Sequence, residues 1–201
     1  MTAQPTAGRP RDPQKDIDVL NATRELLVTE GFQATTIVAI ARRAGVGAPT
    51  IYRRWPRREA LIEDAAFSEV EPTEMPRASG DLWTDVRLWT ARFLHRFADP
   101  VTRAAIPGLL TAYQHDAALF ARLVERSEND ARALLTELLS GYLTGLAPEA
   151  LVARANAVFD FLLASTAIRA LTIGLVDEQS YCDHTADALT ALALSTWTPA
   201  N

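Results

Sequence analysis

Between Glu30 and Glu59 the chain carries six arginines and no acidic residue. Guanidinium groups bind phosphate through paired hydrogen bonds, so a cluster of them is typical of a surface that contacts nucleic acid. Positions 1–64 hold ten basic and eight acidic residues, whereas 65–201 hold ten and seventeen, within a net charge of -5. Without a motif, such a run would be interpreted as a solvated helix surface. The six are Arg42, Arg43, Arg53, Arg54, Arg57 and Arg58.

The same segment has the spacing of a helix-turn-helix. Residues 37–44 predict a short helix with Thr36 available as its N-cap, and residues 48–54 predict a second one. Gly45 can adopt the left-handed backbone of the turn between them, and Ala41 is small enough for the two helices to touch. The second helix of such a motif enters the major groove of DNA. The pattern therefore predicts a helix-turn-helix over about residues 37–55.

A longer string extends this pattern over about residues 14–66, a third of the chain. It consists of EGFQATTI (30–37), IARRAGV (40–46), TIYRRWP (50–56) and EAL (59–61). This string closely resembles the tetracycline-repressor (TetR) family of bacterial transcriptional regulators. The resemblance implies a homodimer with one N-terminal DNA-binding domain per subunit. It also implies a helical C-terminal domain that binds a small molecule and dimerises.

The resemblance places individual residues at the DNA. It implies phosphate-backbone contacts by Thr36, Tyr52 and Arg58, and it leaves the exposed side of the second helix to read bases. An arginine there suits guanine O6 and N7, and a threonine methyl suits thymine. Many relatives open this helix with a serine and then a lysine or arginine, so in this chain apolar contacts or backbone amides would act instead. The predicted positions at the bases are Ala48, Pro49, Thr50, Arg53 and Arg54, and Gly47 is a further predicted DNA contact.

Residues 1–13 predict a flexible basic arm, because three prolines and a glycine interrupt them. Arg9 and Arg11 would lie on this arm. An extended arm with arginines can reach the minor groove beside the main site, and some relatives carry a similar one. The alternative interpretation is a disordered tail that keeps the chain in solution.

These residues must be positioned by helices. Beyond the segments named above, alanine- and leucine-rich stretches predict helices, and β-branched residues do not alternate with polar ones for long in any segment. The sequence predicts an all-α fold of about nine helices, over 14–30, 37–44, 48–54, 57–70, 82–98, 101–113, 116–144, 149–172 and 179–197. The predicted organisation is a DNA-binding domain over 14–70, a linker over 72–80 and an effector-binding and dimerisation domain over 81–201.

The last two predicted helices are apolar nearly all round. Helix 149–172 carries only Asp160 as a charge between Ala155 and Ile168. A helix that is apolar on every face must be covered on every face, and a four-helix interface between two copies achieves this. A fully intramolecular core is the alternative. The predicted dimer interface contains Val152, Phe159, Leu163, Leu189 and Leu192.

Aromatic residues gather in the C-terminal half, where they predict an apolar pocket for a small-molecule effector. A stripe of aromatic residues can equally be plain core. Polar side chains among these apolar residues favour a ligand site, because a few fixed polar groups orient the ligand in an apolar pocket. The predicted lining is Trp89, Phe93, Tyr113, His115, Phe120, Asn156, Phe159 and Asp160.

One enzymatic alternative is a metal-dependent phosphohydrolase of the all-helical HD class. Such an enzyme uses a histidine, a His-Asp pair and a later aspartate to hold a divalent cation and a water molecule. Against it, Asp116 stands where the following helix needs an N-cap, and the arginine-rich motif would have no role. The candidates for these ligands are His95, His115, Asp116, and Asp160 or Asp183.

The remaining features narrow the function. Cys182 is the single cysteine, which excludes an internal disulfide and a multi-cysteine zinc site; its thiol is interpreted as inert packing or a redox switch. The first thirty residues lack an apolar core, and no charge-free run reaches the roughly 18 residues of a membrane span. We therefore expect a cytoplasmic protein, at the nucleoid when bound to DNA, without cofactor, metal or catalytic site.

The preferred interpretation is a ligand-responsive transcriptional regulator, most simply a repressor, that binds a palindromic operator as a homodimer. A constitutive regulator that needs no ligand, or one that responds to a protein partner, remains open.

Overall fold

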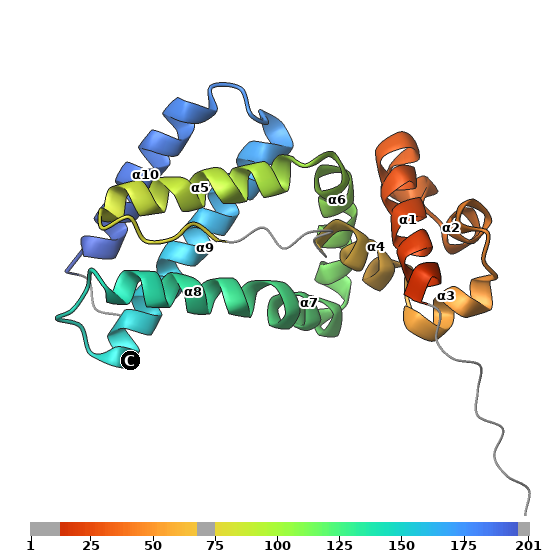
Figure 1. Ribbon diagram of the computed structural model, residues 1–201, viewed down its shortest axis with the longest axis horizontal. Coiled ribbons are helices and arrows are strands. Elements are labelled where there is room, and N and C mark those ends of the chain that lie inside the picture. The colour runs from red at the N-terminus through yellow and green to blue at the C-terminus, as the bar shows by residue number, and fades with distance from the viewer. Residues whose placement is uncertain (1–12, 68–74, 197–201) are drawn as a thin grey trace, which may run out of the picture.

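The computed structural model describes residues 13–67 and 75–196, and these residues form helices and no strand. The prediction of an all-α fold is confirmed. The N-terminal helices, at one end of the molecule, are α1 (Pro13–Ala34), α2 (Ile37–Ala44), α3 (Ala48–Arg54) and α4 (Arg58–Phe67) (Figure 1). The rest are α5 (Leu82–Ala98), α6 (Pro100–His115), α7 (Ala117–Leu123), α8 (Asn129–Ser140), α9 (Pro148–Thr172) and α10 (Glu178–Leu194).

One predicted helix is divided in the structure. Instead of a single helix over 116–144, α7 is followed by a π-helical turn, Val124–Glu128, and by α8, which ends at Ser140. Asp116 is the N-cap of α7, as predicted, and accepts a hydrogen bond from the Leu119 amide at 3.1 Å. A π-turn inserts an extra residue into a helix and so rotates the next helical turn about the axis. Here it buries Glu128, whose carboxylate accepts a hydrogen bond from Arg132 at 3.0 Å.

The N-terminal helices share a small core of their own. Its buried side chains come from α1, α2, α3 and α4 and include Val19, Leu26, Ile40, Ile51 and Leu61. The regular course of α1 breaks at Gly31, whose φ of 80° lies in the region that favours glycine. This is the residue at which the sequence predicted the helix to stop, and the chain continues in helical form to Ala34.

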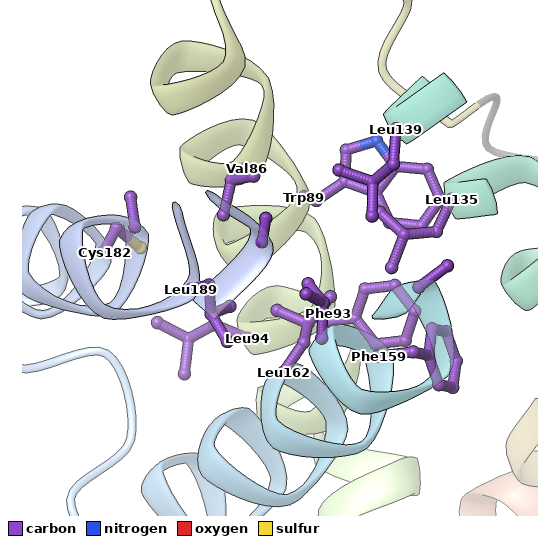
Figure 2. Packing of buried hydrophobic residues seen from close by; sticks show 14 of the residues in the cluster. Val86, Trp89, Phe93, Leu94, Leu135, Leu139, Phe159, Leu162, Cys182 and Leu189 are labelled. Atoms are coloured by element: carbon purple, nitrogen blue, oxygen red, sulfur yellow. The ribbon is translucent and has the colours of Figure 1, made fainter. Parts of the chain in front are cut away.

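The C-terminal helices form a bundle in which α5 packs against both α9 and α10, and α8 packs against α9. Figure 2 shows its core, where Trp89 of α5 lies beside leucines of α8 and Phe93 faces Phe159 of α9. The rings of Phe93 and Phe159 meet edge to face, with their centroids 5.6 Å apart. Aromatic rings in this arrangement bury a large apolar area and also fix their relative orientation.

Two buried charged residues tie irregular segments to the bundle. Asp85 accepts hydrogen bonds from the Ser79 amide at 2.8 Å and from the Tyr142 hydroxyl at 2.5 Å, which holds the segment before α5. Arg154 of α9 donates to the carbonyls of Ala193 and Ser195, at 2.8 and 2.5 Å. A cation is favourable at a helix C-terminus, so Arg154 fixes the end of α10.

The two sets of helices are joined through α6, which packs against both α1 and α4. Leu27, Ile62, Ala105 and Leu109 form a buried cluster at this junction. Gly108 allows the closest approach, because a Cβ at this position would overlap the ring of Phe32. Thr102 also donates from its hydroxyl to the Ala66 carbonyl at 3.2 Å. The N-terminal helices are thus seated on the bundle through a packed apolar contact.

Of the described helices, only α9 is long and apolar enough to cross a membrane by length and composition. A third of its most apolar window is buried within the protomer. Core helices of globular proteins pass the same test, and α9 packs against α5, α8 and α10.

Candidate nucleic-acid interface and ligand cavity

The turn between α2 and α3 has the geometry that a helix-turn-helix requires. Thr36 caps α2, and its hydroxyl accepts a hydrogen bond from the Ala39 amide at 3.2 Å. Gly45 ends α2 in the left-handed conformation, with φ 65° and ψ 27°, and its amide donates to the Ala41 carbonyl. This cap satisfies a helix-terminal carbonyl that would otherwise lack a donor. The turn therefore fixes the direction in which α3 leaves α2.

Buried anchors set which side of α3 faces outward. Ile51 is fully buried, and Trp55, at the end of the helix, is buried and donates from its indole nitrogen to Asp64 at 2.7 Å. The start of α3 has Gly47 as its N-cap, with no side-chain hydrogen bond. Glycine has no side chain, so the first amides of α3 receive no side-chain cap from this position.

Most of the predicted DNA-contacting side chains of α3 lie on its exposed side, whereas Ala48 packs against the N-terminal core. Tyr52, Arg53 and Arg54 are exposed, as is Pro49, and Thr50 and Ala48 are half-buried. Arg53 donates to the Thr50 hydroxyl at 2.9 Å, so these two side chains lie together on the helix surface. Arginine and threonine side by side offer a guanidinium donor and a methyl group to the same stretch of major groove.

Some of the arginines form ion pairs with acidic residues of the protein itself. Arg43 pairs with Glu25 at 3.0 Å and Arg54 lies 3.6 Å from Asp16. Both acids come from α1 and lie outside the acid-free segment. Folding thus brings carboxylates close to arginines that the sequence separates from them, and part of the expected positive charge is compensated.

Arg57 and Arg58 make contacts that join parts of the fold. Arg57 forms an ion pair with Asp116, the N-cap of α7. Arg58 stands over the Phe32 ring, 4.6 Å from its centroid, and donates to the Phe32 carbonyl at 3.2 Å and to Glu59 at 3.0 Å. Thr36, which the resemblance also assigns to phosphate, is exposed. Arg9 and Arg11 lie outside the described residues.

A cavity of about 180 Å³ lies in the C-terminal bundle, between α4, α5, α6, α7 and α9. Four of the predicted lining residues are on its wall: Phe93, Tyr113, Phe120 and Phe159. The aliphatic part of the wall was not predicted, because nothing in the sequence distinguishes a leucine that lines a cavity from a leucine of the core. The remaining residues of the whole cavity wall are Phe67, Arg96, Phe97, Ile106, Leu109, Leu110, Leu123, Glu128, Leu163, Ala167, Ile168 and Leu171.

The other four predicted lining residues lie elsewhere. Trp89 faces a groove beside Tyr142, and His115 lies in a polar groove between Tyr52 and α7. Asn156 lines a shallow surface groove beside α8, and Asp160 is exposed and pairs with Arg132 at 2.6 Å. The direction of a side chain around its helix decides these positions, and an aromatic stripe does not reveal it.

The predicted dimer residues also point to different sides of their helices. Phe159 and Leu189 are only 1% and 4% exposed and belong to the core of the protomer, whereas Val152 is exposed and Leu163 and Leu192 are half-buried. Other apolar residues that α9 and α10 present to the outside were not predicted: Phe161 and Ile168 on α9, and Ala188, Ala191 and Leu194 on α10. Their helical spacing was a readable signal.

The residues of the enzymatic alternative have other partners. His95 lies 3.2 Å from Glu178, and Asp183 pairs with Arg87 at 2.5 Å. Within the described ranges no group of three or more histidine, cysteine or acidic residues is arranged to hold a metal ion. Cys182 is buried, and burial raises the pKa of its thiol. A protonated, buried thiol is a poor nucleophile.

Two family descriptions match this chain. Residues 19–65 match "Bacterial regulatory proteins, tetR family", and residues 76–189 match "Tetracyclin repressor-like, C-terminal domain". The uncharacterized HTH-type transcriptional regulator YdeS of Bacillus subtilis (strain 168) is 42% identical over 65 residues, 32% of this chain and 33% of that protein. Regulator Mb1581 of Mycobacterium bovis is 30% identical over 129 residues, 62% of this chain and 56% of that protein. The chain thus spans between a third and just over half of these relatives.

Solved structures share the whole architecture. The TetR family transcription regulator SCO0332 superposes with a TM-score of 0.64 and 30% identity, over 90% of this chain and 97% of that one. A TetR variant from Acinetobacter baumannii AYE, solved in complex with minocycline, has a TM-score of 0.56 and 17% identity over 92% and 95%. The second likeness concerns the fold alone. With both of its halves matched, the chain belongs to the TetR family of bacterial helix-turn-helix regulators.

Proposed function

We propose that this protein is a ligand-responsive repressor that binds a palindromic operator as a homodimer in the cytoplasm. The observation that carries the proposal is the presentation of α3. Ile51 and Trp55 anchor one side of the helix in the core, and Thr50, Tyr52 and Arg53 stand on the other. A short helix held rigidly with a basic, hydrogen-bonding outer side is suited to the major groove.

The exposed apolar side chains of α9 and α10 support the proposed dimer. Phe161 is 64% exposed and Ile168 is 61% exposed, and small alanines accompany them on both helices. Both helices pack on α5, so their uncovered sides face away from the bundle. A second copy that presents the same face would cover these side chains in a symmetric interface, and would place two α3 helices on one operator.

The cavity is connected to α4, the helix that links the DNA-binding helices to the bundle. Phe67, at the end of α4, lines the cavity, and its carbonyl accepts a hydrogen bond from Arg96 at 2.9 Å. Tyr113 on the wall reaches Glu63 of α4, with 3.4 Å between the hydroxyl and the carboxylate. Burial, and then the charge of Glu63, raise the pKa of Tyr113, so the hydroxyl stays protonated as the donor.

A ligand in the cavity would therefore touch residues that hold the C-terminal end of α4. The other end of α4 begins at Arg58, which stands over Phe32. A shift of α4 would change the separation of the two α3 helices, and a dimer that reads half-sites about 34 Å apart tolerates little change. The ligand releases DNA only if it binds the non-DNA conformation more tightly.

Selection of bound sequences from random duplex DNA with the intact protein tests the DNA part. We expect a palindrome with two half-sites, and an affinity that falls steeply with salt, by about 0.9 log units per log unit of salt for each phosphate contacted. Selection of no preferred sequence would overturn the proposal.

Replacement of Ala167 by phenylalanine tests the release part. The added ring enters the cavity and acts as a built-in ligand, so the operator affinity of Ala167→Phe should fall by about 5–150-fold, the usual range of allosteric coupling. Thermal unfolding checks that the variant is folded. A folded Ala167→Phe dimer with unchanged operator affinity would favour the constitutive regulator.

A further inference from the structure

We infer that the cavity binds a small, neutral, apolar molecule about the size of one or two fused aromatic rings. This inference rests on the proposed function, because it names the chemical class of the effector at the same site. Four properties of the cavity carry it: the composition of its wall, the state of its polar groups, its volume and its rim.

The wall is built almost entirely from hydrocarbon. Of its side chains, only Arg96, Glu128 and Tyr113 carry a charged or hydrogen-bonding group. The aromatic rings are not parallel: Phe93 meets Phe159 at 90°, and Tyr113 meets Phe120 at 54° with centroids 5.7 Å apart. Ring edges and ring faces are therefore both presented, and an aromatic guest can stack on one ring and meet the edge of another.

Each polar group of the wall already has a partner inside the protein. Tyr113 donates to Glu63, Arg96 donates to the Phe67 carbonyl, and Glu128 accepts from Arg132. Among the described residues, none of the buried side-chain nitrogens or oxygens without a partner belongs to this wall. A ligand with polar groups would have to compete with these internal partners, and the rest of the wall offers it no donor or acceptor.

Charge argues in the same direction. A cationic ligand would have to share Glu128 with Arg132, which stands 4.4 Å from the centroid of the Phe159 ring and also binds Asp160. An anionic ligand would have as its cationic partner on the wall only Arg96, whose guanidinium already donates to the Phe67 carbonyl and stands over the Phe67 ring. Burial of an ion without a new partner is strongly unfavourable. A neutral molecule avoids both costs.

The volume limits the size of the molecule. An apolar cavity of roughly 150 Å³ in another protein stays dry and holds benzene. The cavity here, at about 180 Å³, is slightly larger, which suits toluene or naphthalene and is small for a four-ring hydrocarbon. The exposed lining residues Leu110 and Phe120 mark the rim, and both are apolar. The path into the cavity thus favours the same class of molecule.

The experiment compares uncharged and charged probes of matched size on the full-length protein. Toluene and naphthalene are the neutral probes, benzoate and benzylammonium the charged ones, and pyrene tests the size limit; binding is measured by calorimetric titration and by thermal shift. We expect naphthalene to bind at least about 30-fold more tightly than either ion, because even a small desolvation penalty has this effect. Pyrene should bind more weakly than naphthalene.

Two variants locate the binding. Ala167→Phe should abolish naphthalene binding, because its ring occupies the cavity, whereas Ala133→Phe adds the same ring to the exposed surface of α8 and should bind as the wild type does. If Ala167→Phe does not fold, the order of the probes on the wild-type protein still decides the matter.

Several outcomes would overturn the inference: an ion that binds as tightly as naphthalene, neutral probes that do not bind up to their solubility, or naphthalene binding that survives in folded Ala167→Phe. Operator binding, measured in parallel, separates the two proposals. A protein that binds its selected DNA but no neutral probe contradicts only the ligand class. A protein that binds naphthalene but no DNA sequence supports the ligand class and contradicts the proposed function.

Discussion

The N-terminal helices and the C-terminal bundle present their candidate sites in different ways. In the N-terminal helices, the candidate base-reading residues lie on one short helix, α3, and at its N-cap, within a few positions of each other, and most of them are exposed. The cavity wall, by contrast, comes from five α-helices and the π-turn, and its residues extend from Phe67 to Leu171. A site on one helix can be changed one side chain at a time, whereas a site made by packing changes with the fold around it.

The largest effect is expected at the outer face of α9, where an exposed residue should matter to assembly. Phe161→Asp places a charge in the proposed dimer interface, so the protein should become monomeric while its core stays intact. Operator affinity should fall by about 100-fold or more, because the second half-site loses its effective concentration. Sedimentation and operator titration measure the two quantities.

The matched control is Leu134→Asp, which introduces the same charge at another exposed leucine, 43% exposed on α8. It should leave the dimer and the operator affinity unchanged. A Phe161→Asp protein that is still dimeric would place the interface elsewhere and would leave the apolar face of α9 unexplained.

The next effect concerns specificity. Arg53→Ala should weaken operator binding by roughly 1–3 kcal/mol for each base that the arginine reads, and should relax the preference at one position of each half-site. Stability should hardly change, because Arg53 is exposed and its hydrogen bond to Thr50 lies on the surface. Repeated selection with the variant reads the outcome, with Arg122→Ala on α7 as the control. An unchanged consensus would mean that another part of the protein reads the bases.

Gly108→Ala tests the contact between the two regions. A methyl group at this position would overlap the Phe32 ring, so the junction must open, at a cost of about 1–3 kcal/mol of unfolding free energy. Gly141→Ala is the control, because its Cβ would make only an ordinary contact, 3.5 Å from the Leu138 carbonyl. Urea unfolding compares them. Equal stability of the two variants would show that Phe32 has room to move.

Structural features that depend on neighbouring residues along the chain were predicted correctly from the sequence. Thr36 and Gly45 occupy caps that their residue types favour, and Asp116 caps α7 for the same reason. The predicted helix over 116–144 was wrong in its continuity, because a π-turn has no strong residue signature; Glu128, at the end of this turn, pairs with Arg132 four residues further on.

Prediction was weaker where direction around a helix decides the role. Helix α9 is apolar on most sides, so its sequence does not say that Phe159 turns into the core and Phe161 turns outward. The packing of α5, α8 and α10 against α9 selects the inner side. The same limit applies to Trp89, which shares a stripe with Phe93 but lines a different groove.

The smallest effect is expected at Arg58, where the two regions meet and two roles compete. If Arg58 contacts a phosphate, Arg58→Ala should lower the operator affinity by less than about tenfold. It should also lower the slope of log affinity against log salt by about one for every DNA sequence alike. If Arg58 instead positions Phe32, its replacement should lower the stability of the protein.

The variant Arg58→Lys separates the two roles, because lysine keeps the charge but lacks the planar group that stands over the ring and reaches the Phe32 carbonyl. We expect Arg58→Lys to keep the wild-type salt slope and to lose stability together with Arg58→Ala. A salt slope that Arg58→Ala leaves unchanged would remove Arg58 from the DNA interface and leave it as a link between α1 and α4.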